Sequence, residues 1–293
     1  MPAVHTEIFK VRHYECDSYG HVNNAVYLRY MQEAGIGAAA ALGQDHQTLE
    51  AMNRTWLPRF TEIEYLLPLS AGEIIAVKTW VSGFRRVISR RNYEFRKHDQ
   101  EEVIARGYTD WVFLDRDRLH PVTIPMEVKS LFIPEAADQA LSPRYQFPEP
   151  APPPEGVFRV VRRVEWQDID MMQHLNNAAY LDYVMDAGVQ LTSAFGWPMS
   201  YWLEEGIAFV ARRNSIEYLS PAFLDDALEI TTWLFNVRPA TVTRHFEIRR
   251  NRTDELLARI QTLWVMLDLN SGRPMRIPGS MIGILSSNIS EEK

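Results

Sequence analysis

Hydrophobic and polar positions follow two periods along the first part of the chain. Residues 8–14 alternate between apolar and polar side chains, which is the pattern of a half-buried strand. After a polar loop, apolar residues recur at helical spacing over residues 27–38, and Gly43 is the expected stop. Asn23 and Asn24 precede this segment as candidate N-caps. Runs rich in Val, Ile, Tyr, Trp and Phe then predict four strands, at about residues 60–67, 73–83, 87–98 and 102–115.

The whole pattern occurs twice, because sliding the sequence by 153 residues aligns it with itself. Residues 11–35 match residues 164–188 at 11 of 25 positions. The same offset, without a gap, aligns residues 59–68 with residues 212–221 and pairs other strand segments further on. Loop lengths are therefore repeated together with residues, which is the signature of a duplicated unit.

The two copies are joined by a proline-rich segment. Residues 134–154 hold seven of the chain's 17 prolines, a composition typical of an extended, unpacked linker that runs over the surface. We predict an N-terminal domain over residues 1–134, a Pro-rich linker over residues 135–155 and a C-terminal domain over residues 156–293.

The order of elements predicts an α+β fold in each copy. Each has one long helix rich in Ala and Gly, and no helical period interrupts the strands that follow it. Consecutive strands favour an antiparallel sheet, and small residues on the helix allow that sheet to wrap closely over it. Because two such sheets would expose edges, we expect the copies to form a pseudo-twofold pair within one chain.

The composition of the chain limits which binding partners and which cellular compartment we expect. The net charge of −7 and the pI near 5.7 give no reason to expect nucleic acid or anionic lipid as a partner. No segment has the length of apolar sequence that a membrane span needs, and the first ten residues lack a signal peptide's apolar core, so we expect a cytoplasmic protein. A single cysteine, Cys16, permits no internal disulfide and argues against a Cys-rich zinc site.

The polar cluster that recurs lies in the loop before each long helix. It reads ECDSYGHVNN over residues 15–24 and DIDMMQHLNN over residues 168–177. A helix N-terminus offers unpaired N–H groups to a developing oxyanion, and a carboxylate upstream can act as a base or a nucleophile. Cys16 is not the expected nucleophile, because Ile169 replaces it in a copy that keeps the acid, the histidine and the asparagines.

At this loop and helix the sequence resembles the hotdog-fold thioesterases. Copy one resembles the 4-hydroxybenzoyl-CoA thioesterase type, and copy two, DIDMMQHLNNAAYLDY, is more similar to the acyl-ACP thioesterases, whose chains are also tandem hotdogs. The resemblance implies a double hotdog fold, thioester hydrolysis and no cofactor or metal. It implies three kinds of catalytic group, namely carboxylates, active-site histidines and backbone N–H oxyanion donors: Asp17 and Asp170, His21 and His174, Asn24 and Asn177.

Two departures from the acyl-ACP pattern bear on the mechanism. The family's catalytic asparagine falls on Met172 in copy two and on Tyr19 in copy one, and neither side chain is an amide donor. The later catalytic glutamate falls on proline in both copies, although Glu217 and Glu64 lie four residues earlier. No catalytic glutamate is therefore assigned.

Other residues are candidates for binding the substrate, and each also has a structural interpretation. Asn23 and Asn176 are candidate helix caps. Tyr27 and Tyr180 are expected in the core or along an acyl groove. Arg85 and Arg90 belong to an arginine cluster that could receive a CoA phosphate or an acidic carrier protein, or could face solvent.

The sequence therefore predicts an acyl thioesterase, and the thiol carrier is either CoA or acyl carrier protein. Two alternatives stay open: a non-catalytic acyl-thioester-binding protein and a 3-hydroxyacyl-thioester dehydratase. We expect a monomeric pseudo-dimer or a homodimer.

Overall fold

The computed structural model describes residues 1–133 and 146–290. The chain divides into two compact units, Met1–Gln146 and Phe147–Lys293. Each unit contains one long helix and one antiparallel sheet, and these are described separately below.

Unit 1 has a five-stranded sheet in the order β1-β3-β4-β5-β2, with antiparallel neighbours throughout. The strands of unit 1 are β1 (Val4–Lys10), β2 (Arg54–Tyr65), β3 (Ile74–Phe84), β4 (Ile88–Lys97) and β5 (Val103–Asp115). Its α-helices are α1 (Asn24–Ala40), α2 (His46–Ala51) and α3 (Met126–Phe132).

Unit 2 repeats this topology in the order β6-β8-β9-β10-β7. Its strands are β6 (Phe158–Arg163), β7 (Ile207–Tyr218), β8 (Ala227–Phe235), β9 (Thr241–Arg250), β10 (Glu255–Asp268) and the short β11 (Arg273–Pro274), which pairs with β10. Its α-helices are α4 (Ala179–Ala194), α5 (Met199–Glu204) and α6 (Gly279–Ile284).

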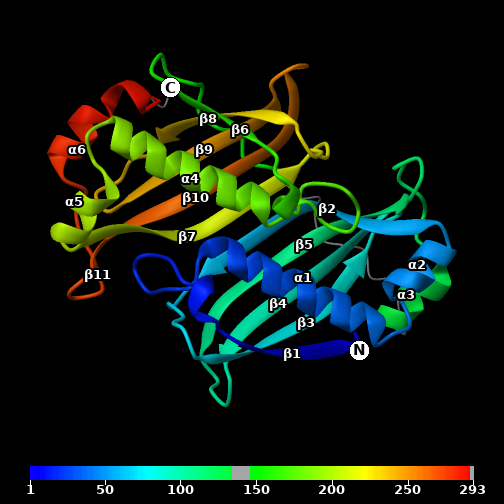
Figure 1. Cartoon of the computed structure of the whole chain (residues 1–293). Coiled ribbons are helices and arrows are strands. Elements are labelled where there is room, and N and C mark those ends of the chain that lie inside the picture. The colour runs from blue at the N-terminus through cyan, green and yellow to red at the C-terminus, as the bar shows by residue number, and fades with distance from the viewer. Residues whose placement is uncertain (134–145, 291–293) are drawn as a thin grey trace. The chain divides into compact units, whose positions relative to one another are not determined.

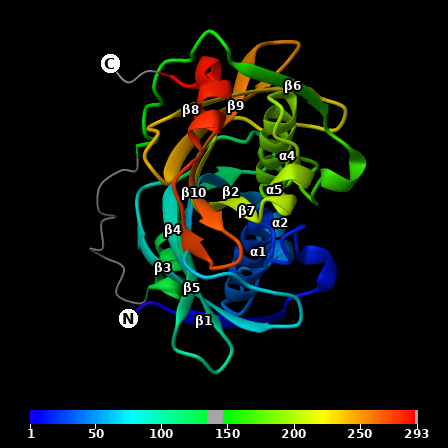
Figure 2. The ribbon, with the colours of Figure 1, turned by 90° about the vertical axis from the view of Figure 1, so that its left-hand side faces the viewer.

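The long helix of each unit lies against one face of its own sheet (Figures 1 and 2). The buried side of α1 carries Tyr27, Met31, Ala34 and Ala38, which recur at helical spacing. Gly35 allows close packing, because a Cβ at this position would lie 3.0 Å from the Tyr93 hydroxyl oxygen. The small residues of the helix thus have the role that the sequence predicts for them.

The predicted elements agree best with the structure where the hydrophobic pattern extends over many residues. The four strands after α1 lie near their predicted places, although β2 begins at Arg54 rather than near residue 60. The first strand is displaced and ends at Lys10. A short 3₁₀ helix, His13–Glu15, follows it, and the Glu15 carboxylate accepts the Arg12 N–H at 2.6 Å. The short helices α2, α3, α5 and α6 are absent from the prediction, because six or seven residues carry little periodic signal.

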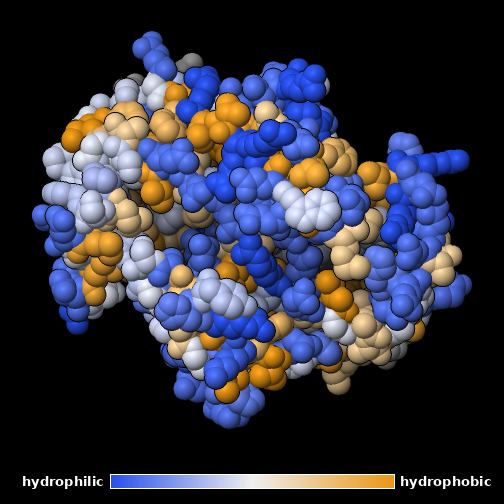
Figure 3. Space-filling model, viewed as in Figure 1, coloured by the Kyte–Doolittle hydropathy of each residue, from blue (hydrophilic) through white to orange (hydrophobic). Residues whose placement is uncertain are grey.

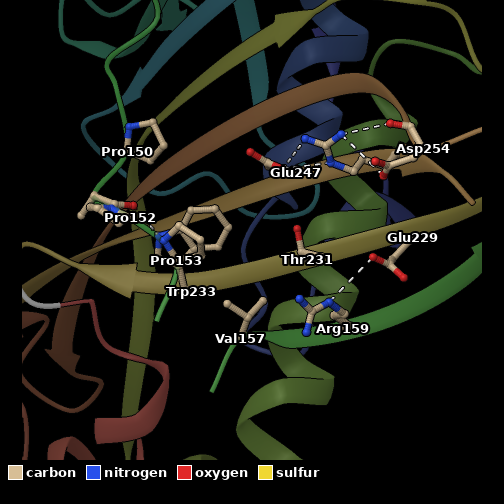
Figure 4. Close-up of a pocket in the computed structure, with 12 residues that line it drawn as sticks. Pro150, Pro152, Pro153, Val157, Arg159, Glu229, Thr231, Trp233, Glu247 and Asp254 are labelled. Atoms are coloured by element: carbon tan, nitrogen blue, oxygen red, sulfur yellow. Dashed lines mark hydrogen bonds and ion pairs between the residues drawn. The ribbon is translucent and has the colours of Figure 1, made fainter. Parts of the chain in front are cut away.

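The described part of the proline-rich segment runs largely exposed along unit 2, as the sequence predicts for a linker, and contacts unit 2 at individual residues. Phe147 is 4% exposed, lies under the Arg259 guanidinium and makes an edge contact with His245. The carbonyl of Ala151 accepts a hydrogen bond from Trp233 Nε1 at 3.0 Å, and Figure 4 shows Pro153 beside this tryptophan. The Phe147 ring and the Ala151 carbonyl make these contacts with unit 2. Residues 134–145 of the predicted linker lie outside the described residues.

The surface is mainly polar on the face drawn in Figure 3, where hydrophobic residues lie in small separate groups. Within residues 1–133 and 146–290, no helix is both long enough and apolar enough to cross a membrane.

Candidate active site

The loop before the long helix has the same backbone hydrogen bonds in both units. In unit 1, the Asp17 N–H donates to the His21 carbonyl at 2.8 Å. In unit 2, the Asp170 N–H donates to the His174 carbonyl at 2.9 Å. The tight turn requires a positive φ one residue before the histidine, and this angle is 79° at Gly20 and 62° at Gln173. The repeat therefore extends to backbone geometry.

The predicted catalytic carboxylates lie inside this turn. Asp17 Oδ1 accepts the Tyr19 N–H at 2.9 Å and the His21 N–H at 3.3 Å. Asp170 Oδ1 accepts the Met172 N–H at 2.8 Å. Neither Oδ2 atom has a hydrogen bond or ion pair to a residue that the structure describes. One oxygen thus holds the loop, and the other can accept a proton.

Two acids upstream have a structural partner that the sequence reasoning missed. Tyr30 donates to the Glu15 carboxylate at 2.7 Å, and Tyr183 donates to Asp168 at 2.6 Å. Burial, together with these carboxylates, raises the pKa of both tyrosines, so they are neutral donors. The signal was present, because acid and tyrosine recur in both copies fifteen residues apart.

The helix N-terminus follows directly after the histidine. Asn23 Oδ1 accepts the Ala25 N–H at 3.0 Å and so caps α1, and Asn176 Oδ1 accepts the Ala178 N–H at 2.9 Å in the turn that leads into α4. Tyr218 donates to the Asn177 carbonyl at 3.1 Å, just as Tyr65 does at the matching position in unit 1. The N–H of Asn177 donates to none of the described residues. A positively polarised group is therefore available at this end of α4.

The two histidines have different surroundings. The His174 ring makes an edge contact with Phe223, with centroids 5.2 Å apart. Burial lowers the pKa of His174, and the nearby Asp170 opposes this effect only in part. His21 is paired through its backbone with Ser70, which occupies the position of Phe223 in the repeat. Unit 2 thus holds a neutral imidazole against an apolar wall.

The tyrosines predicted to bind substrate are buried in the core. Tyr27 is 3% exposed and packs edge-on against Tyr65. Tyr180 is also 3% exposed, and its hydroxyl accepts the Ala222 N–H at 3.0 Å. Tyr180 therefore braces the loop that carries Phe223.

The structure does not bring the predicted arginines to this loop. Arg85 follows β3 in the turn before β4. Arg90 makes a bidentate pair with Asp110 at 2.7 and 2.8 Å and stacks on Tyr108. Its neighbour Arg91 faces α1, so Arg90 points to the opposite face of the sheet. Asp110 thus compensates the charge of Arg90, and this pair lies on the face of the sheet opposite α1.

Two pockets are lined by residues of unit 2. One, of about 370 Å³, lies over Trp233 and the prolines, and its arginines are paired with acids in Figure 4. The other, of about 380 Å³, is lined by Tyr183, Arg162 and Asp186, and so adjoins the tyrosine that holds Asp168. Among the residues described, no three His, Cys, Asp or Glu side chains are grouped so that they could hold a metal ion.

Comparison with known families gives one result for both copies. A family model described as the thioesterase-like superfamily matches residues 11–132 and again residues 164–285.

Related sequences fall into two groups. Oleoyl-acyl carrier protein thioesterase 1 of Arabidopsis thaliana is 24% identical over 199 residues, which are 62% of this chain and 54% of that protein. The chain therefore spans about half the length of this relative. Acyl-CoA thioester hydrolase YbgC of Escherichia coli O157:H7 is 29% identical over 126 residues, which are 43% of this chain and 93% of that protein.

Solved structures share the fold over nearly the whole chain. A protein of Lactobacillus plantarum, assigned as an oleoyl thioesterase, superposes with a TM-score of 0.79 at 18% identity and covers 91% of this chain and 97% of its own. The 12:0-ACP thioesterase from Umbellularia californica has a TM-score of 0.68 at 19% identity, with coverages of 90% and 94%. The fold is thus of the two-repeat hotdog type, with antiparallel sheets.

Proposed function

The chain belongs to the thioesterase-like superfamily, and from this premise we propose that it hydrolyses an acyl thioester to a free acid and a thiol. The observation that carries the proposal is the loop of unit 2, where the free oxygen of Asp170 precedes the unpaired N–H of Asn177 at a helix start. Relatives act on acyl-ACP and on acyl-CoA, so either thiol is the proposed carrier.

The reaction needs a base, an oxyanion site and a proton for the leaving group. Asp170 Oδ2 takes a proton from water while the water oxygen bonds to the thioester carbonyl carbon. The Asn177 N–H stabilises the charge that develops on the carbonyl oxygen. The carbon–sulfur bond then breaks, and the thiolate receives the proton from Asp170. Neutral His174 accepts a hydrogen bond from the attacking water and so orients it.

Three features favour unit 2 as the working copy. The Asn177 N–H donates to none of the described residues and lies three residues after His174, which has apolar surroundings. His174 lies against Phe223, and burial keeps this imidazole neutral at neutral pH, as an acceptor must be. The segment around this loop also exposes two large apolar side chains, Trp166 and Met171, which are 75% and 77% exposed. His13 and Ser18 occupy the matching positions in unit 1.

One observation favours a second candidate, an acyl-thioester-binding protein without catalysis. Met172 and Tyr19 stand where the similar acyl-ACP family has a catalytic asparagine. The Met172 N–H braces Asp170, but its side chain supplies no amide. Hydrolysis by this chain must therefore depend on the remaining groups.

Thiol release separates the two candidates. Wild type, Asp170→Asn, Asp17→Asn and the double variant are assayed with a panel of acyl-CoAs and acyl-ACPs, and circular dichroism checks the fold. We expect Asp170→Asn to lose about 10²- to 10⁴-fold in kcat/KM, as for loss of a general base, while Asp17→Asn stays within a few-fold of wild type. Equal losses would reject the assignment to unit 2. Tight acyl-CoA binding without thiol release by wild type would establish the binding protein.

A further inference from the structure

A buried arginine lies under the middle of the long helix in unit 2. Arg244 on β9 is 6% exposed, and a Cβ added at Gly188 of α4 would lie 3.3 Å from its Nη1 atom. The glycine therefore leaves room for the guanidinium between helix and sheet. Burial lowers the pKa of Arg244 to about 10, so the side chain is charged at neutral pH.

This cation has one long hydrogen bond and no carboxylate partner among the described residues. Its Nη1 donates to the Gly188 carbonyl at 3.3 Å, which is a long hydrogen bond. Its Nε is buried without a partner, and no described carboxylate pairs with the side chain. A buried charge is costly unless it is paired and hydrogen-bonded. An acceptor at the Nε of Arg244 would therefore lower the cost of burying this charge.

A second buried donor lies nearby on the same face of the sheet. Trp264 on β10 has its Nε1 buried without a partner. Arg244 pairs in register with Thr262, so Trp264 is the diagonal neighbour of the arginine, within reach of long side chains. Two donors without acceptors favour an oxygen anion, and the guanidinium fork matches a carboxylate.

Unit 1 has an arginine at the same position with a different contact. Arg91 is also 6% exposed, but its guanidinium lies over the Phe132 ring at 5.5 Å and is 3.4 Å from Thr79 Oγ1. Leu285 takes the place of Phe132 in the repeat and cannot supply a cation–π contact. The ring contact of Arg91 is therefore missing at Arg244, whose Nε is buried without a partner, whereas the matching tryptophans Trp111 and Trp264 both have a buried Nε1 without a partner.

The position of the arginine relates it to the candidate active site. Gly188 follows Asn177 by eleven residues, which is about 16 Å along the helix axis. The intervening buried side of α4 is apolar and includes Val184 and Ala187. If the thioester carbonyl binds at Asn177 and the acyl chain runs along this side of α4, the far end of a medium-length chain reaches the region of Arg244.

We propose that Arg244 binds a carboxylate at the distal end of the acyl group, so that the preferred substrates are ω-carboxyacyl thioesters. This inference rests on the proposed hydrolysis, because it names the acyl class that the same site takes. Trp264 Nε1 donates the second hydrogen bond to the carboxylate, and Gly188 admits the guanidinium.

The test compares substrates of equal length within each variant. kcat/KM is measured for decanedioyl- and dodecanedioyl-CoA against decanoyl- and dodecanoyl-CoA, with wild type, Arg244→Met and the matched control Arg91→Met. Wild type and Arg91→Met should prefer the ω-carboxyl substrate, and Arg244→Met should lose about tenfold to a hundredfold of this preference, the value of a charge-assisted hydrogen bond. The ratio is independent of the fraction of enzyme that folds.

Binding gives a readout that does not need turnover. Calorimetry with the free acids should show that dodecanedioate binds wild type more tightly than dodecanoate, and that Arg244→Met abolishes the difference. Hydrolysis of plain acyl-CoAs with no such preference, or a preference that survives in Arg244→Met, would overturn the carboxylate site alone. Absence of all thiol release would instead count against the proposed hydrolysis, and calorimetry would still decide the role of Arg244.

Discussion

The Asp–His loops of the two units share a backbone and differ in what surrounds it. Both have the same turn, the same asparagine that accepts the N–H two residues later, and the same tyrosine bonded to the upstream acid. The side chain that faces the histidine is Phe223 in unit 2, and Ser70 occupies that position in unit 1. Groups that set geometry were thus retained in both copies, while groups that set polarity diverged. The environment, rather than the motif, distinguishes the proposed working copy.

The two sheets also differ in the residues at matching strand positions. A substitution at one of these positions is expected to have the largest effect on the free energy of unfolding. Gly107 on β5 corresponds to Ile260 on β10. A Cβ at Gly107 would lie 2.4 Å from the Glu62 carbonyl oxygen, so a strand must move to accept any side chain. Gly107→Ala should lower the free energy of unfolding by about 3 kcal/mol, at the upper end for overpacking.

Urea unfolding followed by circular dichroism measures this change. Gly279→Ala is the control, because nothing lies within 4 Å of a Cβ at that position. If Gly107→Ala matched the control, β2 and β5 would not approach as closely as the structure has them, and the contrast between the two sheets would vanish.

These positions show what the sequence could predict and what it could not. The internal offset predicts both units and both loops, since periodicity and repeated letters are local properties. It cannot predict that Gly107 faces a carbonyl of β2, that Tyr30 bonds to Glu15, or that Trp233 donates a hydrogen bond to the Ala151 carbonyl. Each of these depends on segments that meet only in the folded chain. Arg90 shows the same limit, because its partner Asp110 lies on the neighbouring strand.

The contact of Phe223 with His174 predicts an effect of intermediate size on the pH dependence of kcat/KM. Burial lowers the pKa of His174, so the wild-type imidazole stays neutral to a lower pH than an exposed histidine. Phe223→Ser should raise this pKa towards its ordinary value. The acid limb of the kcat/KM profile then moves to higher pH, and activity near pH 6 falls several-fold.

The matched variant is Ser70→Phe in unit 1, which should leave the profile unchanged. An NMR titration of His174 in Phe223→Ser separates a change of pKa from a loss of packing. An unchanged His174 titration would show that Phe223 does not control the charge of the imidazole, and a shifted profile in Ser70→Phe would place catalysis in unit 1.

The smallest expected effect concerns the turn itself. Gln173 has a φ of 62°, in the left-handed region where side chains are disfavoured, whereas unit 1 has Gly20 there. Gln173→Gly removes this strain but adds freedom to the unfolded chain, so the net gain should be about 0.5–1 kcal/mol. Gly20→Gln should cost a similar amount, and urea unfolding measures both. A loss of stability in Gln173→Gly would mean that the Gln173 side chain makes contacts worth more than the strain, and the two turns would then differ in more than their glycine.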